Sequence, residues 1–254
     1  MPSVLPLRWD PSPDPITLRV ADVVRETKDV VSIHLESATG DRLASFAPGQ
    51  HLPIAVPIGS GNSPARRTYS LSSSPTGHRY RISVKRIPDG VVSSYLHARF
   101  EPGVTLQTYP PAGEFVLPGG DEPVVLIAAG IGVTPMLSML HAHVENDSER
   151  RLHFYYGARD GSHLAMASEI RSLVAKCASA KLWVALSQPE EHEALGDTYD
   201  MVGRLEGASI AADVGARADY LLCGPSAFMA SMTSQLSAAG VPVERIFYES
   251  FGAG

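Results

Sequence analysis

Two glycines follow an apolar run in the stretch AAGIGVTPM, residues 128–136. Gly130 and Gly132 allow the backbone to turn tightly and let a ligand approach the main chain. Thr134 can cap the helix expected next, and Pro135 is tolerated in a first helical turn because its missing N–H would be unpaired anyway. Since a helix N-terminus favours an anion, this turn predicts a phosphate site; a turn that binds nothing is the alternative.

Polar side chains alternate along RRTYSLSSSP, residues 66–75. Strand periodicity places Arg67 and Tyr69 on one face, and Thr68 and Ser70 on the other. Arg67 could pair with a phosphate, Tyr69 could stack on a ring, and Ser70 could hydrogen-bond a ring nitrogen. The alternative is a half-buried strand with a polar outer face.

A glycine opens a predicted helix in DGVVSSYLH, residues 89–97. The first N–H groups of that helix, from Val91, Val92 and Ser93, form a second candidate anion site. An ordinary helix start with Ser93 or Ser94 as the local capping residue is the alternative.

Two more candidates lie late in the chain. LLCGPSAFM places Cys223 at the carboxyl end of a predicted strand, which is where ligands bind in open α/β sheets. In FYESFGAG, Glu249 and Phe251 share one face of a predicted strand. The alternatives are a small buried hydrophobic side chain for Cys223, and a surface glutamate beside a core aromatic residue.

The first half of the chain has the periodicity of β structure. Six short strands separated by Gly, Pro and Asn predict a small antiparallel barrel. One helix is expected near 91–100. The expected strands are 16–24, 30–37, 51–58, 67–74, 80–87 and 105–117.

The second half alternates strands and helices, which predicts a doubly wound parallel sheet. We expect a linker-like arm at 1–14, one domain at 15–118 and the other at 119–254. The expected strands are 122–130, 151–159, 181–189, 218–225 and 245–251, and the expected helices are 134–146, 163–177 and 226–240.

Composition narrows the classes of function. A net charge of −6 argues against nucleic acid, and no apolar stretch approaches the length that spans a membrane. The first residues do not have the pattern of a secretory signal. Two cysteines cannot form a disulfide framework or a four-cysteine metal site, so a reduced, cytoplasmic setting is expected. His141 and His143 are two apart on a predicted helix and face different ways, so no metal is expected.

Charge is distributed unevenly between the two halves. Residues 1–118 hold 12 Lys and Arg against 10 Asp and Glu, whereas residues 119–254 hold 9 against 17. A solvated sheet face and a site for an anionic ligand or an acidic partner both remain open for the basic cluster of the first half. That cluster comprises Arg66, Arg67, Arg79, Arg81, Lys85 and Arg86.

In their order along the chain, the motifs R-x-Y-S, G-x-V-S, G-x-G-x-T-P, C-G-P-x-x-F-M and E-x-F resemble the ferredoxin–NADP reductase superfamily. The resemblance covers residues 16–254 and includes PGQH at 48–51 and PAGEF at 111–115. Within the superfamily, the chain is most similar to the reductase modules of flavohaemoglobins and of Rieske oxygenases. The resemblance implies a six-stranded antiparallel FAD-binding barrel, followed by a doubly wound NAD(P)-binding domain.

The resemblance assigns the flavin to the first domain, and the G-x-V-S turn favours FAD over FMN. Arg67 is implied to pair with the pyrophosphate, Tyr69 to pack on the isoalloxazine, and Ser70 to lie near its reactive nitrogen. Further flavin contacts are implied for His51, Thr68, Ser83, Val84 and Lys85, and contacts with the FAD pyrophosphate for Gly90, Val91, Val92 and Ser93.

The nicotinamide nucleotide is assigned to the second domain. Ser70, Cys223 and Glu249 are expected to tune hydride transfer. NADP-specific relatives carry an arginine where Gln188 stands, and the neighbouring Glu190 and Glu191 would repel a phosphate, so NADH is expected rather than NADPH. The implied contacts are Gly130, Gly132, Thr134, Arg159, Gln188, Cys223, Gly224 and Pro225, with Glu249 and Phe251 closing the flavin pocket.

The implied function is hydride transfer from NADH to FAD, followed by single-electron transfer to a protein acceptor. That acceptor would be an iron–sulfur domain, a ferredoxin, a Rieske oxygenase or a haem protein. Since the C-x4-C-x2-C spacing of a plant-type iron–sulfur domain is absent from the sequence, either the acceptor is a separate protein or this chain is a piece of a longer one with such a domain fused to it.

Two other functions are compatible with parts of the pattern. A flavin-free NAD-dependent dehydrogenase would leave the Arg67–Ser70 strand and the Gly90 turn unexplained. A non-catalytic FAD-binding electron-transfer or regulatory subunit would leave the GIGVTP and CGP motifs and Glu249 without a purpose.

Overall fold

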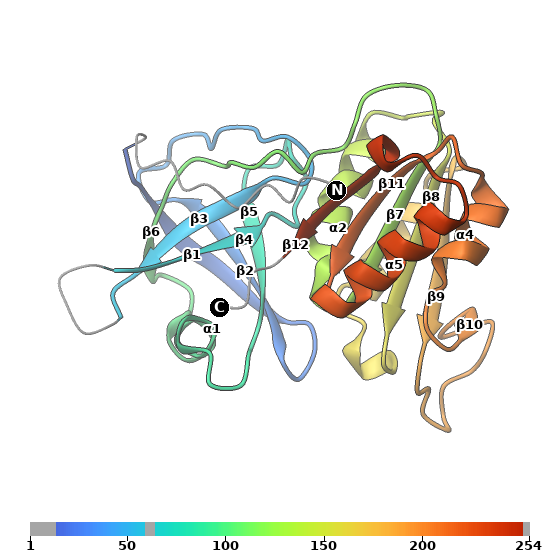
Figure 1. The fold of residues 1–254 in the computed structure, drawn as a ribbon. Helices are drawn as coiled ribbons and strands as arrows, with labels where there is room; N and C mark the ends of the chain where they lie inside the picture. The colour runs from blue at the N-terminus through green and yellow to red at the C-terminus, as the bar shows by residue number, and fades with distance from the viewer. Residues whose placement is uncertain (1–13, 59–63, 251–254) are drawn as a thin grey trace. The chain divides into compact units, whose positions relative to one another are not determined.

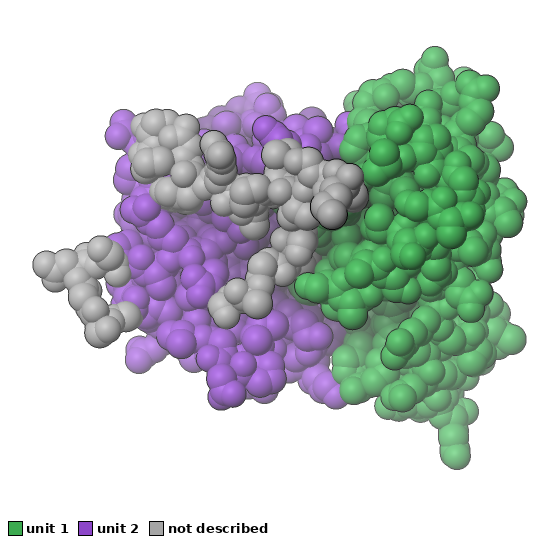
Figure 2. Space-filling view, in the orientation of Figure 1, with its two compact units in different colours: residues 1–2, 118–136, 143–253 green, residues 3–117, 137–142, 254 purple. Residues whose placement is uncertain are grey.

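The computed structural model describes residues 14–58 and 64–250 of the chain. Contacts between Cα atoms divide it into two compact units, which Figure 2 distinguishes by colour. Unit 2 contains the described residues up to Leu117 together with Leu137–Ala142, and unit 1 contains Pro118–Met136 and the described residues from His143 onward.

Unit 2 is built on a six-stranded antiparallel sheet, as the sequence predicts. The strands follow the order β4-β3-β6-β1-β2-β5 (Figure 1). The last predicted strand is shorter than expected because Pro110 and Pro111, which have no N–H to donate, follow it closely. The elements are β1 (Ile16–Arg25), β2 (Val30–Ser37), β3 (His51–Val56), β4 (Ala65–Ser70), β5 (Tyr80–Lys85), α1 (Val91–Arg99) and β6 (Thr105–Thr108).

Among the residues that the structure describes, one isolated β-bridge closes this sheet into a barrel. Leu71, just after β4, pairs with Ile82 of β5, which joins the two ends of the strand order. Both side chains are fully buried, as are Ile33, Leu52 and Ile54 from the neighbouring strands. Closure leaves the sheet without a free edge at this point and buries one face of every strand in a common core.

Unit 1 is a six-stranded sheet in which every pair of strands is parallel. Its order is β10-β9-β8-β7-β11-β12, the doubly wound arrangement that the sequence predicts. The strands are β7 (Val124–Ala129), β8 (Leu152–Ala158), β9 (Ala180–Leu186), β10 (Met201–Val202), β11 (Asp219–Gly224) and β12 (Ile246–Ser250).

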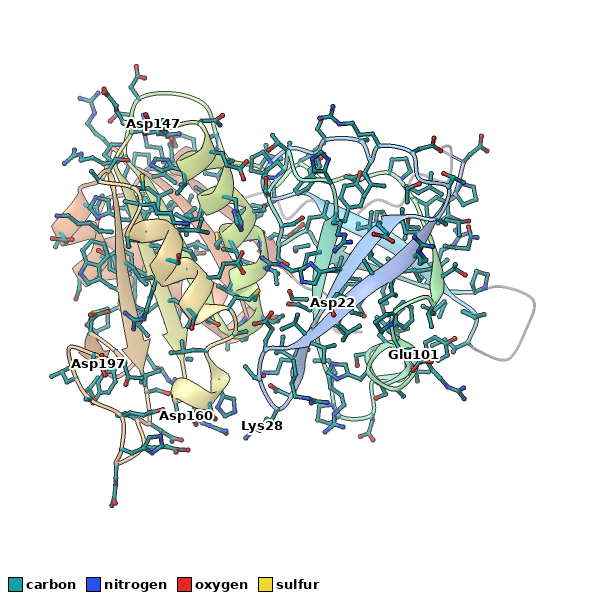
Figure 3. All side chains as sticks on the ribbon, turned by 180° about the vertical axis from the view of Figure 1, so that it is seen from behind. Asp22, Lys28, Glu101, Asp147, Asp160 and Asp197 are labelled. Atoms are coloured by element: carbon teal, nitrogen blue, oxygen red, sulfur yellow. The ribbon has the colours of Figure 1, made fainter. Side chains whose placement is uncertain are left out.

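Helices cover both faces of the parallel sheet. α2 and α3 lie on one face, and α4 and α5 lie on the other (Figures 1 and 3). Among the described residues, none of these helices is both long enough and apolar enough to cross a bilayer. They are α2 (Val133–Glu145), α3 (Ala167–Val174), α4 (Gly207–Val214) and α5 (Ser226–Ala238), with short 3-10 turns η1 (Gly130–Gly132), η2 (Gly161–His163) and η3 (Val243–Arg245).

One sequence prediction in unit 1 was inexact, and two elements were not predicted. The helix expected at 163–177 begins only at Ala167, because Met166 adopts a left-handed conformation with φ of 58° and interrupts it. Helix α4 and the two-residue strand β10 were not predicted. Both missed elements lie between β9 and β11 in the sequence, and β10 forms one edge of the sheet.

The chain reverses its direction of winding at β7. From β7 it proceeds to β8, β9 and β10 on one side, and it then returns to β11 and β12 on the other. In open α/β sheets, ligands bind outside the carboxyl ends of the strands at such a switch point. The turns that follow β7 and β11 are the GIG and CGP motifs of the sequence.

Candidate cofactor-binding sites

The PGQH and PAGEF motifs meet in unit 2. The N–H of His51 donates to the carbonyl of Ala112 and the N–H of Ala112 donates to the carbonyl of His51, both at 2.9 Å. Gly113 has φ of 114°, and a Cβ there would lie 2.8 Å from Nδ1 of His51. A glycine is therefore needed for the imidazole to pack against this backbone. The pairing of β3 with β4 places His51 opposite Ser70, so the structure brings these two predicted residues together.

Strand β4 carries the predicted flavin residues Arg67, Thr68, Tyr69 and Ser70. Tyr69 packs against the barrel core, and burial raises the pKa of its phenol to about 12, against the smaller opposite effect of Arg67. The phenol therefore stays protonated at neutral pH. Arg67 is exposed, and its Nη1 donates to the carbonyl of Arg66 at 2.8 Å. Arg67 and Tyr69 share a strand face, as predicted.

The predicted contacts on β5 are mostly committed to the barrel itself. The Ser83 hydroxyl lies 2.8 Å from that of Ser32 and 3.0 Å from that of Ser72. Val84 is fully buried in the core. The ammonium group of Lys85 lies 3.5 Å from a carboxylate oxygen of Asp29. The side chains of Ser83 and Val84 could contact a flavin only if they left these buried positions. Their main-chain N–H and C=O groups are therefore the ones that could bind it.

The turn before α1 has the shape of an anion cradle. A Cβ on Gly90 would lie 2.7 Å from Oγ of Ser93 and 2.9 Å from Cβ of Ile87. The Ser93 hydroxyl accepts the N–H of Ile87 at 3.1 Å, so it closes the turn and does not cap the helix. The first amides of α1, from Val91 to Ser93, have no preceding turn of helix to bond. This arrangement fits the pyrophosphate of FAD.

Glycine is needed at the two positions of the GIG turn for different structural reasons. Gly130 has φ of 54°, and no atom lies within 4 Å of the place where a Cβ would stand. At Gly132, by contrast, a Cβ would overlap the carbonyl of Cys223 and would lie 2.7 Å from the amide nitrogen of Gly224. Gly132 therefore lets the GIG turn pack on the CGP turn, and Gly130 is the glycine that borders open space.

Thr134 does not cap α2, contrary to the prediction. It is the second residue of the helix, and its hydroxyl donates to the carbonyl of Ile131 at 3.0 Å. It is also buried, with 3% of its surface exposed. Pro135 lies in the first turn of α2, where the sequence places it.

Cys223 and Glu249 are neighbours on adjacent strands, in register between β11 and β12. Burial raises the pKa of the Cys223 thiol well above its ordinary value, and the Glu249 carboxylate acts in the same direction. The thiol is therefore protonated at neutral pH and is a poor nucleophile. Pro225 follows as the residue before α5, and Phe251 lies outside the described residues.

Arg159 and Gln188 are brought together at the carboxyl ends of β8 and β9. The N–H of Gln188 donates to the carbonyl of Arg159 at 2.7 Å. The residue after Arg159, which the sequence analysis did not single out, is Asp160 (labelled in Figure 3). Its carboxylate accepts hydrogen bonds from Arg159, Ser162 and His163. Burial acts to raise the pKa of Asp160, but these three donors hold it below its ordinary value.

Glu193 is a second residue that the sequence analysis missed. Its carboxylate accepts the N–H of Gly161 at 2.6 Å and the N–H of Glu190 at 2.8 Å. The first bond holds the loop after β9 against the loop after β8, and the second stabilises the loop after β9 itself. The spacing R-D-x-x-H directly after a strand is the sequence signal that could have drawn attention to this edge.

Comparisons with known proteins agree with both halves of this description. Residues 17–117 match the family model of the oxidoreductase FAD-binding domain, and residues 126–234 match that of the oxidoreductase NAD-binding domain. A flavohemoprotein of Deinococcus radiodurans is 36% identical over 235 residues, which cover 92% of this chain and 58% of that protein.

Two solved structures are similar in fold and sequence. The FAD/NAD-binding domain of a nitric oxide dioxygenase from Vibrio cholerae has 31% identity and a TM-score of 0.81, and the match covers 94% of this chain and 100% of that one. A flavohemoglobin from Malassezia yamatoensis with bound FAD and heme has 28% identity and a TM-score of 0.82, over 94% and 60% of the two chains.

The chain belongs to the ferredoxin–NADP reductase superfamily, and it is an FAD- and NAD-binding reductase module. The match to an FAD-binding domain contradicts the flavin-free dehydrogenase alternative. The chain spans 57–60% of the length of the curated flavohemoproteins that it matches.

Proposed function

We propose that this chain oxidises NADH, with FAD as its resident cofactor, and delivers single electrons to a haem protein. One observation carries the proposal: the GIG turn packs directly on the CGP turn at the switch point of the parallel sheet. A regulatory subunit that binds only FAD would have no need of this close packing.

The proposed flavin site lies in unit 2. Arg67 and the first amides of α1 would hold the pyrophosphate, because both present N–H groups to an anion. Tyr69 and His51 would border the isoalloxazine. Bound FAD supplies the redox chemistry, since a flavin takes up a hydride and releases its electrons one at a time.

The proposed nucleotide site lies at the carboxyl edge of unit 1. The Gly130 turn would take the pyrophosphate of the nucleotide, with Gly132 keeping that turn in place. Cys223 would border the nicotinamide as a neutral thiol and would exclude water without competing as a base. Gln188 stands beside the acidic Glu190, which favours NADH over NADPH.

The proposed acceptor is a haem group. The curated relatives are named flavohemoproteins, and one similar structure contains both FAD and heme. Because this chain spans only part of those proteins, the haem would lie either on a separate protein or on another part of a longer chain.

The flavin assignment is tested with Arg67→Ala and the matched control Arg99→Ala, an exposed arginine at the end of α1. We expect Arg67→Ala to lose bound FAD while its far-UV circular dichroism is unchanged, and Arg99→Ala to retain FAD. Stoichiometric FAD in the Arg67→Ala protein would contradict the assignment.

The acceptor is tested by mixing the NADH-reduced protein with a ferric globin or with a plant-type [2Fe–2S] ferredoxin under argon. We expect faster reduction of the globin. Faster reduction of the ferredoxin would replace the haem acceptor with an iron–sulfur protein.

A further inference from the structure

Three side chains after β8 form a closed network. Nε of Arg159 lies 3.1 Å from Oδ2 of Asp160, and Nδ1 of His163 lies 2.6 Å from Oδ1 of the same carboxylate. Nη2 of Arg159 also lies 2.6 Å from Nε2 of His163. An arginine N–H can only donate, so Nε2 accepts, and the hydrogen bonds assign the neutral imidazole with its proton on Nδ1.

Asp160 anchors this network. Its side chain is only 8% exposed, and its carboxylate also accepts the Ser162 hydroxyl at 2.6 Å. The Arg159 side chain is 51% exposed, so it stands at the surface with its charge already paired. To turn toward another anion, the Arg159 side chain would first have to break its contacts with Asp160 and His163.

The neighbouring loop adds negative charge to the same edge. Glu193 is bonded to main-chain amides of Gly161 and Glu190, which satisfy its oxygens without cancelling its charge. A Cβ on Gly161 would overlap Oε1 of Glu193, so the carboxylate could not keep this position against a larger residue. Figure 3 shows Asp160 and Asp197 at this end of unit 1, and Asp147 at the opposite end.

The network follows the second strand of a βαβ unit, and this position indicates a role in binding the nucleotide. β7, α2 and β8 form a βαβ unit whose first turn is the GIG motif. In dinucleotide-binding sheets, an acidic residue about 20 positions after the first turn bonds the ribose 2′-hydroxyl of NAD, and an arginine nearby accommodates the 2′-phosphate of NADP. Here both residue types follow the second strand directly, as Arg159 and Asp160.

We infer that Asp160 and His163 hold Arg159 away from a 2′-phosphate, which makes residues 159–163 the element that selects NADH. This inference rests on the proposed function. It goes beyond the effect of Gln188 and Glu190, because it explains why Arg159, which could bind a 2′-phosphate, does not do so.

The test measures binding of NAD⁺ and of NADP⁺ to the FAD-loaded protein by calorimetry. Asp160→Asn removes the charge that holds Arg159, and we expect the ratio of NADP⁺ to NAD⁺ affinity to rise about tenfold. In the double variant Arg159→Gln/Asp160→Asn, that gain disappears. Glu244→Gln, an exposed residue before β12, removes the same charge elsewhere in unit 1 and leaves the ratio unchanged.

His163→Leu is the second variant, because it retains the charge of Asp160 while it removes the acceptor of Nη2 and the Nδ1 donor to Asp160. We expect it to raise the same ratio about threefold, and it decides the question if Asp160→Asn does not fold. An unchanged ratio in the folded single variants overturns the inference, as does a gain that persists without Arg159. If the unaltered protein binds neither nucleotide, the proposed function fails, and the inference fails with it.

Discussion

The parallel sheet has an arginine–aspartate network at each end, and the two differ in burial. At the amino end, Asp219 pairs with Arg150 at 2.6 Å and with Arg245 at 2.9 Å. The Arg150 and Asp219 side chains are 10% and 11% exposed. At the carboxyl end, Asp160 is equally buried, but its partner Arg159 is 51% exposed.

The comparison shows that position in the fold decides what the same residue types do. Arg150 also donates to the carbonyls of Pro118 and Glu122, so the amino-end network fastens the segment that enters β7. No ligand is expected at that end of a parallel sheet. The carboxyl-end network stands where ligands bind, and it leaves its arginine within reach of solvent. We therefore interpret the first as structural and the second as selective.

The largest expected effect is loss of stability at the amino end. Asp219→Asn would leave the mostly buried Arg150 and the 30% exposed Arg245 without their counter-charge, and we expect the free energy of unfolding to fall by about 3 kcal/mol. Urea denaturation measures it. The control is Glu122→Gln, which removes the surface pair with the 87% exposed Arg217 and should cost less than about 1 kcal/mol. Equal losses in the two variants would contradict the structural interpretation.

A second effect separates the two glycines of the GIG turn. Gly132→Ala forces a Cβ into the Cys223 carbonyl, and we expect a loss of about 1–3 kcal/mol in stability together with weaker NAD⁺ binding. Gly130→Ala meets no neighbouring atom and should cost about 1 kcal/mol, from its positive φ alone. Thermal melts and calorimetry measure both. Greater damage from Gly130→Ala would reverse the roles assigned to the two positions.

A third effect is the pH dependence of the carboxyl-end network. The folded protein holds the pKa of Asp160 below its unfolded value, so the stability it contributes is present above that unfolded value, about 4, and is lost as pH falls further. We expect wild type to exceed Asp160→Asn by about 1–2 kcal/mol at pH 7, and this difference to shrink in acid. Urea denaturation at pH 7 and pH 3 measures it. A difference that grows toward pH 3 would have the wrong sign.

The smallest expected effect is at Arg159 itself. Because this side chain is half exposed, Arg159→Gln should change the free energy of unfolding by less than about 1 kcal/mol. Arg150→Gln, the matched change at the amino end, should cost several times more. If the two variants lose similar stability, the two networks do not differ in the way that their burial indicates.

Much of the fold could be predicted from local sequence patterns. Alternation found all six barrel strands, and apolar runs followed by Gly found β7 and β11. Helix α4 was missed because GASIAADV begins with glycine and has no strongly charged face. Strand β10 was missed because two residues have no periodicity; Asp200 helps to hold it, by accepting the Val184 N–H at 2.8 Å.

The candidate site likewise contains residues that the sequence predicts and contacts that only the folded structure shows. Arg159 and Gln188 were predicted from the resemblance, and the structure places them side by side. The need for glycine at 132 could not be predicted, because the atoms that it must avoid belong to Cys223, far along the chain. The contact of Glu193 with Gly161 likewise depends on two loops that only the parallel sheet brings together.

Anaerobic reduction of the purified protein tests the central claim most directly. The protein is loaded with FAD, and the flavin absorbance is followed after separate additions of NADH and NADPH. We expect the flavin to bleach rapidly with NADH and more slowly with NADPH. A flavin that remains oxidised with both nucleotides would contradict it and would favour a subunit that binds FAD without turning over NADH.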